Sequence, residues 1–396
     1  MASITRAKLA QAVQLVQRSG LDAWLIFVRE TVEGCDPALP LVLNGGLTWQ
    51  SALLVTASGR KIAIVGNYDA DAIRASGDWD EVIPYVQGIQ EDLLAVLERE
   101  ITSDIPRIGV NYSTDDCKAD GLSHGMFMLL RSYLQNTRFA DSLESAESVV
   151  TRLRAQKTSV EIERMQRAIF ETDRLFNEVP AFCRIGVSEL ALQQHIQDLM
   201  AERALGYAWD RVGNPIVNFG PDSMIGHGIP SAHLKLQPGM IVHLDLGVIA
   251  EGYASDIQRC WFVGDEVPEE IQRALEAVVG AIRAGAEVLK PGAQGWQVDE
   301  AARNFLVSQG YPEYLHAFGH QVGRIAHDGG AVLGPRWERY GRTPCIPIEQ
   351  DEVYTLELGI DVPGRGYLGL EEMVRITADG LEYLTTPQTT MPLICG

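Results

Sequence analysis

The fold is decided by one stretch of sequence, Ile241-Val242-His243-Leu244-Asp245-Leu246-Gly247-Val248. Side chains alternate between the two faces of a strand, so its apolar residues fall on one face: Val242, Leu244, Leu246 and Val248. His243 and Asp245 must then share the other face. The stretch therefore predicts a strand that presents an acid away from the packed side of its sheet.

A second acid, Asp256, follows eleven residues after Asp245, and the segment between them carries a turn signal. A turn centred on Ala250 and Glu251 would place Asp245 and Asp256 directly opposite each other, with Cβ atoms roughly 5 Å apart. Two carboxylates this close repel each other unless they share a proton or a cation. The predicted hairpin therefore needs positive charge.

A later stretch, residues 353–360, repeats this alternation and carries Glu357 on its polar face. It is followed by a glycine-rich turn and then by Glu371. Pairing of the two strands about Gly364 would place Glu357 opposite Glu371. His320 lies between the two hairpins in the sequence, so the chain holds two similar acidic hairpins and one intervening imidazole.

Four carboxylates and one imidazole are the ligands that two divalent cations need, because a bridging carboxylate neutralises both ions. A single member of the set would be an ordinary solvated acid at a strand end. Together the five residues predict a dinuclear metal site where two related halves of a domain meet: Asp245, Asp256, His320, Glu357 and Glu371.

The type, order and spacing of these five residues resemble the ligand set of the pita-bread metallopeptidases, a family that includes methionine aminopeptidase, aminopeptidase P, prolidase and the metal-free creatinase. The resemblance covers roughly residues 150 to 390. It implies that Asp245 holds one metal, that His320 and Glu357 hold the other, and that Asp256 and Glu371 bridge them. The ions would be Mn, Co, Zn or Fe.

The resemblance also implies catalytic roles for three side chains. Glu357 would relay a proton from the attacking water, and His227 and His327 would donate hydrogen bonds to the oxyanion of a tetrahedral intermediate. His243 shares the face of Asp245 and is expected to line the cavity. His316 precedes His320 by four residues, but Gly319 argues against a helical zinc pair.

One position departs from the family pattern. Proline-directed members carry an arginine two positions before the last glutamate, where this chain has Gly369. Loss of this fixed cation argues against ordinary Xaa-Pro specificity, and Arg324 and Arg365 are candidates to replace it. We expect an arginine at position 369 to raise activity on Xaa-Pro dipeptides if the pocket has room.

Three functions fit this pattern. The leading hypothesis is a dinuclear metal-dependent hydrolase of the Xaa-Pro peptidase type, which cleaves an amide bond in a small peptide-like substrate. The alternative, favoured by Gly369, is a non-peptidase of the same fold, either a hydrolase or a lyase that acts on a small amidine, cyclic amide or osmolyte. A catalytically inactive binding protein is the third, and the complete ligand set argues against it.

Two domains are expected, because 396 residues exceed the size at which a single core usually stops growing. Residues 1–150 alternate short apolar runs with helical ones, which predicts an α/β domain, and they resemble the N-terminal domain of creatinase. Residues 151–396 would form the pita-bread catalytic domain with pseudo-twofold symmetry, giving an α/β (α+β) protein overall. The first domain is expected to be structural and to build a homodimer, with the loop at residues 28–46 bordering the partner's site.

Composition limits the possible partners and compartment. A formal net charge of −20 would repel phosphate backbones and anionic membranes, so neither nucleic acid nor a membrane is expected as a partner. The N-terminus predicts an amphipathic helix rather than a signal peptide. The six cysteines are scattered, which favours free thiols and a cytoplasmic location.

Overall fold

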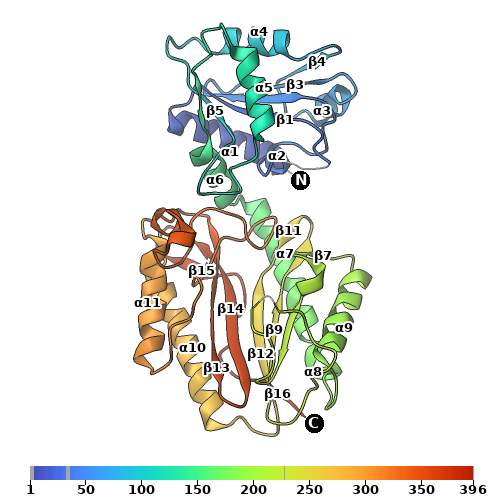
Figure 1. Ribbon diagram of the computed structural model, residues 1–396, viewed down its shortest axis with the longest axis vertical. Helices are drawn as coiled ribbons and strands as arrows, with labels where there is room; N and C mark the ends of the chain where they lie inside the picture. Colours follow the sequence, from blue (N-terminus) through green and yellow to red (C-terminus); the bar gives the residue numbers. More distant parts are fainter. Residues whose placement is uncertain (1–3, 33–35, 227, 396) are drawn as a thin grey trace. The chain divides into compact units, whose positions relative to one another are not determined.

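The computed structural model describes residues 4–32, 36–226 and 228–395 (Figure 1). The chain divides into two compact units, Met1–Arg154 and Ala155–Gly396. Each unit has its own apolar core. In the described part of the chain, no helix has the length and apolar character that crossing a bilayer requires.

The first unit is built on a six-stranded mixed sheet with the strand order β4-β3-β2-β1-β5-β6. Its strands are β1 (Ala23–Val28), β2 (Ser51–Thr56), β3 (Lys61–Gly66), β4 (Glu81–Tyr85), β5 (Ile108–Val110) and β6 (Leu143–Ser145). Its helices are α1 (Ile4–Ser19), α2 (Leu39–Val42), α3 (Ala70–Ser76), α4 (Gln90–Glu100), α5 (His124–Leu134) and α6 (Glu147–Ala155). This is the α/β arrangement that the sequence predicts.

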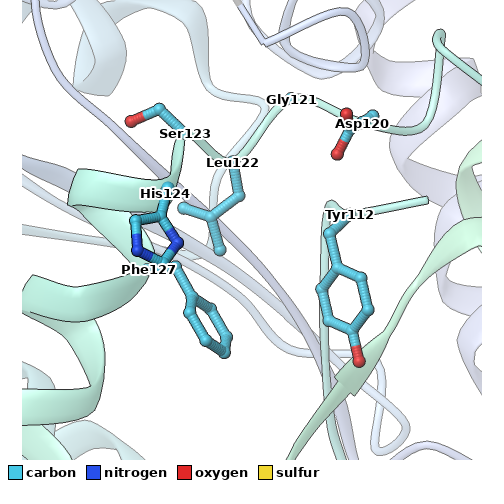
Figure 2. A pocket seen from close by; sticks show the side chains of 7 residues that line it. All are labelled: Tyr112, Asp120, Gly121, Leu122, Ser123, His124 and Phe127. Atoms are coloured by element: carbon cyan, nitrogen blue, oxygen red, sulfur yellow. The ribbon is translucent and has the colours of Figure 1, made fainter. Parts of the chain in front are cut away.

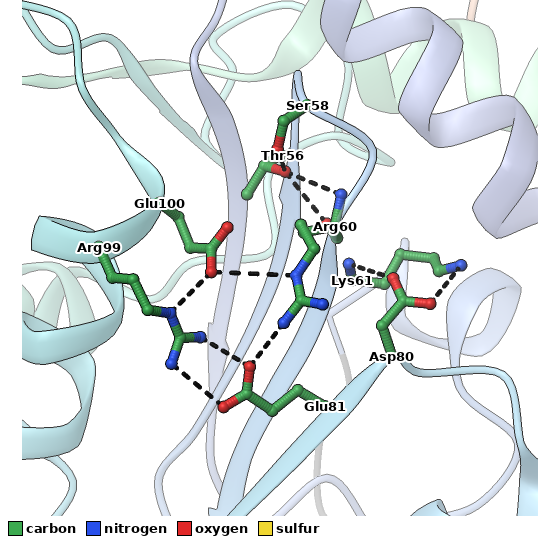
Figure 3. Close-up of polar contacts among 8 residues, drawn as sticks. All are labelled: Thr56, Ser58, Arg60, Lys61, Asp80, Glu81, Arg99 and Glu100. Atoms are coloured by element: carbon green, nitrogen blue, oxygen red, sulfur yellow. Dashed lines mark hydrogen bonds and ion pairs between the residues drawn. The ribbon is translucent and has the colours of Figure 1, made fainter.

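Helices cover both faces of this sheet, because successive side chains of each strand enter different cores. Trp24 packs with apolar residues of α1, α2 and α6, whereas Leu25 packs with those of α4 and α5. Strands buried on both faces carry nearly continuous apolar runs, as β1 does. At the sheet edge, Arg60 and Arg99 both pair with Glu81 and Glu100 (Figure 3). The guanidinium groups of these pairs are solvent-exposed, so the pairs contribute little to stability.

The second unit contains three small sheets. Their strand orders are β16-β12-β9-β8, β13-β14-β15 and β11-β10-β7. The strands are β7 (Gly206–Tyr207), β8 (Ile216–Phe219), β9 (Ile241–Leu246), β10 (Val248–Ala250), β11 (Tyr253–Ala254), β12 (Ile257–Val263), β13 (Val353–Val362), β14 (Gly366–Ile376), β15 (Leu381–Tyr383) and β16 (Leu393–Ile394). The helices are α7 (Ser159–Phe176), α8 (Val179–Phe182), α9 (Glu189–Glu202), α10 (Glu269–Val288) and α11 (Gly295–Ser308).

The two halves of the second unit follow one plan. Helices α7 and α9 precede the hairpin that contains β9 and β12, and helices α10 and α11 precede the hairpin of β13 and β14. The strands lie between the two helical layers (Figure 1). The last strands of the hairpins lie side by side, because Arg259 on β12 donates to the backbone oxygen of Glu371 on β14. As the sequence predicts, Thr158 and Glu161 form a capping box at the start of α7.

The register of the first hairpin differs from the predicted one. Asp245 pairs with Gln258, so Asp256 is its diagonal neighbour and not its direct partner. The turn is centred on Glu251 and Gly252, both of which have positive φ (51° and 81°), as a two-residue hairpin turn of type I′ requires. In the second hairpin Glu357 pairs with Glu371 as predicted.

Candidate metal centre

The five predicted ligands come from both halves of the second unit. Asp245 lies on β9 and Asp256 immediately precedes β12, whereas Glu357 and Glu371 face each other across β13 and β14. His320 lies in the loop between α11 and β13. Pairing within each hairpin and contact between β12 and β14 bring these side chains together.

Distances show that the side chains converge. Nε2 of His320 lies 3.7 Å from Oδ2 of Asp256 and 3.4 Å from Oε1 of Glu357. One potential ligand atom each of Asp256, His320 and Glu371 lies within 4.8 Å of the other two. Asp245 lies near the group: burial raises the pKa values of Asp256 and Glu371 most, and the negative charge of Asp245 raises them further. The structure thus gathers the predicted residues in one place.

The loop that carries His320 is fixed by backbone pairing with β13. The amide of Thr355 donates to the carbonyl of His320, and the hydroxyl of Thr355 accepts from the amide of His320. Nδ1 of His320 lies 3.3 Å from its neighbour's carbonyl, that of Gln321, to which it can donate. That contact places the proton on Nδ1 and leaves the lone pair of Nε2 directed at the carboxylates.

Burial and mutual repulsion make the ionised cluster costly without cations. Burial raises the pKa values of Asp245, Asp256 and Glu371 well above the usual range, and the neighbouring carboxylates raise them further. Burial also raises the pKa of Glu357 to about 7. Burial first, and the adjacent His327 second, lower the pKa of His320 to about 3, so the imidazole is neutral.

The donor set fits divalent metal ions. Oδ1 of Asp245 and Oε1 of Glu371 are buried with no hydrogen-bond partner among the described residues. A buried carboxylate oxygen without a partner is expensive unless a cation or a proton satisfies it. Asp256 and Glu357 face the neutral imidazole of His320, whose Nε2 lies 3.7 Å from the first carboxylate and 3.4 Å from the second. Carboxylates with one neutral imidazole suit Mn, Fe, Co or Zn.

The other predicted site residues have different surroundings. The ring of His327 is exposed and lies perpendicular to that of His320, with centroids 4.3 Å apart. His227 lies outside the described residues. His243 is buried, as its position on the face of Asp245 predicts, and it contacts Gln258. His316 contacts the carbonyl of Ala317 and is not among the gathered ligands.

Space at Gly369 is already filled. A Cβ atom there would lie 2.6 Å from the ring of Tyr367, 2.8 Å from Oε1 of Gln258 and 2.9 Å from Nε2 of His243. The pocket therefore lacks the room that an arginine at position 369 would need to raise activity on Xaa-Pro dipeptides. Arg365 pairs with Glu270 at 2.9 Å.

Arg324 is also engaged elsewhere, because its guanidinium lies over the ring of Tyr253. Both arginines thus have contacts of their own, and their replacement of the missing arginine stays a prediction. The residue that sequence reasoning missed is Gln258, whose Nε2 donates to Oε2 of Glu357 at 2.9 Å and to Oε2 of Glu371 at 3.1 Å. Alternation from Asp256 would have placed it on the same face.

The first unit contains a separate cavity of about 520 Å³. Its lining residues come from the loop before α5 and from α5 itself, together with one tyrosine: Tyr112, Asp120, Gly121, Leu122, Ser123, His124 and Phe127. His124 and Asp120 lie on opposite sides of it (Figure 2). A single separated acid and histidine do not form a ligand set like that of the second unit.

Comparison with known proteins places this geometry in context. The model of the family described as metallopeptidase family M24 matches residues 163–378. The uncharacterized peptidase YqhT of Bacillus subtilis (strain 168) is 28% identical over 268 residues, which are 67% of this chain and 71% of that protein. The Xaa-Pro dipeptidase of Lactobacillus helveticus is 27% identical over 310 residues, 76% of this chain and 80% of that protein.

A solved structure is similar over almost the whole chain. The dipeptidase PepE from Mycobacterium ulcerans superposes with a TM-score of 0.74 at 23% identity, covering 99% of this chain and 98% of that one. At this level of identity the likeness establishes the shared fold, including an N-terminal unit before the catalytic one.

Proposed function

Since the chain belongs to metallopeptidase family M24 and is a metallohydrolase, we propose that it uses two divalent ions to cleave an amide bond in a small peptide-like substrate of the Xaa-Pro type. The observation that carries the proposal is the convergence of His320 with Asp256, Glu357 and Glu371. The named dipeptidase relative supports the substrate class.

The metal-holding roles are those that the family resemblance implies, and the convergence of the side chains supports them. Asp245 would hold one ion, His320 and Glu357 the other, and Asp256 and Glu371 would bridge them. Divalent ions at these positions would supply a nucleophilic water near neutral pH and polarise the scissile carbonyl. The bond from Gln258 restrains Oε2 of Glu357, and the other oxygen of this carboxylate faces Nε2 of His320.

Proton transfer is assigned to Glu357, the glutamate of the pair that is partly exposed. Its side chain is 19% exposed, whereas Glu371 is 1% exposed as a residue. Glu357 would accept the proton of the attacking water and pass it to the leaving amine. His327, which is exposed beside His320, would donate to the developing oxyanion. His227 is proposed for the same task from the resemblance alone.

A defined assay tests this function. Purified protein is stripped with EDTA, reloaded with Mn²⁺ and offered Ala-Pro, Leu-Pro and Ala-Ala. We expect hydrolysis of at least one dipeptide, its loss on chelation and its return with Mn²⁺. Hydrolysis that persists without metal, or reloaded protein that cleaves no amide, would contradict the proposal.

A second candidate function is hydrolysis or elimination on a small non-peptide amide, amidine or osmolyte. It is favoured by Gly369, where Tyr367, Gln258 and His243 occupy the space beside the acids and present no fixed cation to a peptide carboxylate. The same assay with cyclic amides and amidines distinguishes the two candidates. Turnover of such a compound with inert dipeptides would favour the second.

The remaining expectations concern assembly and location. We propose that the first unit is structural and supports a homodimer, for which light scattering should give about twice the 43.5 kDa chain mass. A cytoplasmic location is proposed from the described cysteines, which are free: Cys117, Cys183, Cys260, Cys345 and Cys395.

A further inference from the structure

We propose that Gln258 is a positioning residue for the metal centre and that His243 holds it in place. This inference rests on the proposed metal-dependent function. Gln258 is one of the buried polar residues of β12, and its Nε2 donates to two carboxylates at once, Glu357 and Glu371. These two glutamates are opposite each other in the second hairpin, so one amide from the first hairpin joins both of them.

The two hydrogen bonds from Gln258 determine which carboxylate oxygens remain available to a metal ion. Gln258 engages Oε2 of each glutamate. Oε1 of Glu357 is left facing His320 at 3.4 Å, and Oε1 of Glu371 is left buried without a partner. One oxygen of each carboxylate is therefore fixed by the protein, and the other is directed to the place where the ligand atoms converge. Hydrogen bonds that orient metal ligands in this way commonly change metal affinity by about 10- to 100-fold.

His243 fixes the orientation of the glutamine amide. Because Nε2 of Gln258 donates to the glutamates, its Oε1 must accept, and Nε2 of His243 lies 3.0 Å from that oxygen. The neutral ring donates from Nε2 to Gln258, and Tyr367 packs edge-on against it at 5.1 Å between centroids. The imidazole is held from two sides.

Gly369 makes this arrangement possible. Its missing side chain leaves room for Oε1 of Gln258 and Nε2 of His243, which lie 2.8 and 2.9 Å from the position of a Cβ atom. Gly359, its direct partner across the hairpin, leaves room for the ring of Tyr367, whose Cζ would lie 2.4 Å from a Cβ atom there. The chain thus uses a neutral amide, held by a buried imidazole, where the related sequence pattern has a cation.

The test measures Mn²⁺ binding by calorimetry in the full-length protein, without substrate. Gln258→Met keeps the length of the side chain and removes both hydrogen-bonding groups, and we expect the Kd for Mn²⁺ to rise at least about tenfold. The matched control is Gln193→Met, since Gln193 is also a buried glutamine whose Nε2 donates to two acceptors, the carbonyls of Val212 and Pro215. Its Mn²⁺ affinity should stay within about twofold of the wild type.

A double-mutant cycle tests whether His243 affects metal binding through Gln258 or independently of it. His243→Phe should raise the Kd by a smaller factor, about threefold, and adding it to Gln258→Met should weaken binding no further. If Gln258→Met does not fold, Gln258→Asn keeps the amide but shortens its reach, and the same rise in Kd is expected.

The outcomes distinguish this inference from the proposed function. Suppose that the wild-type protein binds Mn²⁺. Unchanged affinity in the folded Gln258 variant, or additive losses in the cycle, would then overturn the positioning roles of Gln258 and His243 and leave the proposed metallohydrolase function intact. Wild-type protein that binds no Mn²⁺ would overturn both.

Discussion

Glu357 lies directly opposite Glu371 across the hairpin of β13 and β14, and the side-chain amide of Gln258 bonds to both. This relationship explains how a buried and a partly buried acid are kept at close range in one orientation. A neutral donor orients the carboxylates without cancelling their charge. The site therefore retains a strong electrostatic preference for divalent cations.

Gly369→Arg should fail to create an Xaa-Pro peptidase of ordinary efficiency. A side chain at this position would displace Tyr367, Gln258 or His243, and overpacking of a buried site costs about 1–3 kcal/mol. We expect a lower melting temperature and weaker Mn²⁺ binding. Gly380→Arg is the matched control, since a Cβ atom there has open space. A Gly369→Arg protein that is stable and more active on Ala-Pro would contradict this packing argument.

Glu352→Gln should change how stability depends on pH. Burial raises the pKa of Glu352 from its usual 4.5 to about 7, so the folded protein binds more protons than the unfolded chain within this window. The contribution of Glu352 to the free energy of unfolding therefore falls as pH rises from 4.5 to 7, by on the order of 3 kcal/mol in all.

The glutamine variant has no proton to lose and keeps an oxygen for the bond that Tyr354 donates. Its melting temperature relative to wild type should thus rise by several degrees between pH 5 and pH 8. Thermal unfolding of both proteins at the two pH values measures this. A difference that stays constant with pH would show that Glu352 titrates alike in the folded and unfolded states.

Glu251→Asn should stabilise the first hairpin. Glu251 has a φ of 51°, which is unfavourable for glutamate, and Asn-Gly is the preferred pair for a type I′ turn. We expect a gain of about 0.5–1 kcal/mol, measured by thermal unfolding, with unchanged catalytic constants. Gly252→Val at the neighbouring position, where φ is 81°, should do the opposite. Equal melting temperatures for the two variants would argue against the type I′ assignment.

The sequence predicted the faces of the hairpins better than their registers. Shifting the first turn from Ala250-Glu251 to Glu251-Gly252 changes the partner of Asp245 by two residues, and a shift of two keeps every side chain on the same face. Hydrophobic alternation therefore cannot distinguish these registers. In the second hairpin the glycine-rich turn about Gly364, with a φ of 74°, specifies the pairing.

The supporting residues were harder to predict than the candidate ligands. Acids and histidines are recognisable in the sequence as potential metal ligands. Gln258 is one of many glutamines, and its role becomes visible only from its hydrogen bonds to the two glutamates. The position of His320 depends on backbone pairing of an irregular loop with β13, for which the sequence carries no periodic signal. Gly369 was noticed as a loss, but only packing shows which side chains fill its space.

The central claim is a dinuclear centre held by Asp245, Asp256, His320, Glu357 and Glu371, and the stoichiometry of Mn²⁺ binding tests it most directly. Calorimetry on chelator-treated protein should give two Mn²⁺ ions per chain for the wild type. Asp256→Ala removes a proposed bridging ligand and should abolish binding of at least one ion, together with most amide hydrolysis. Elemental analysis of the same samples provides an independent count. A wild-type protein that binds no Mn²⁺, or an Asp256→Ala variant that still binds two ions with wild-type affinity, would contradict the assignment of the site.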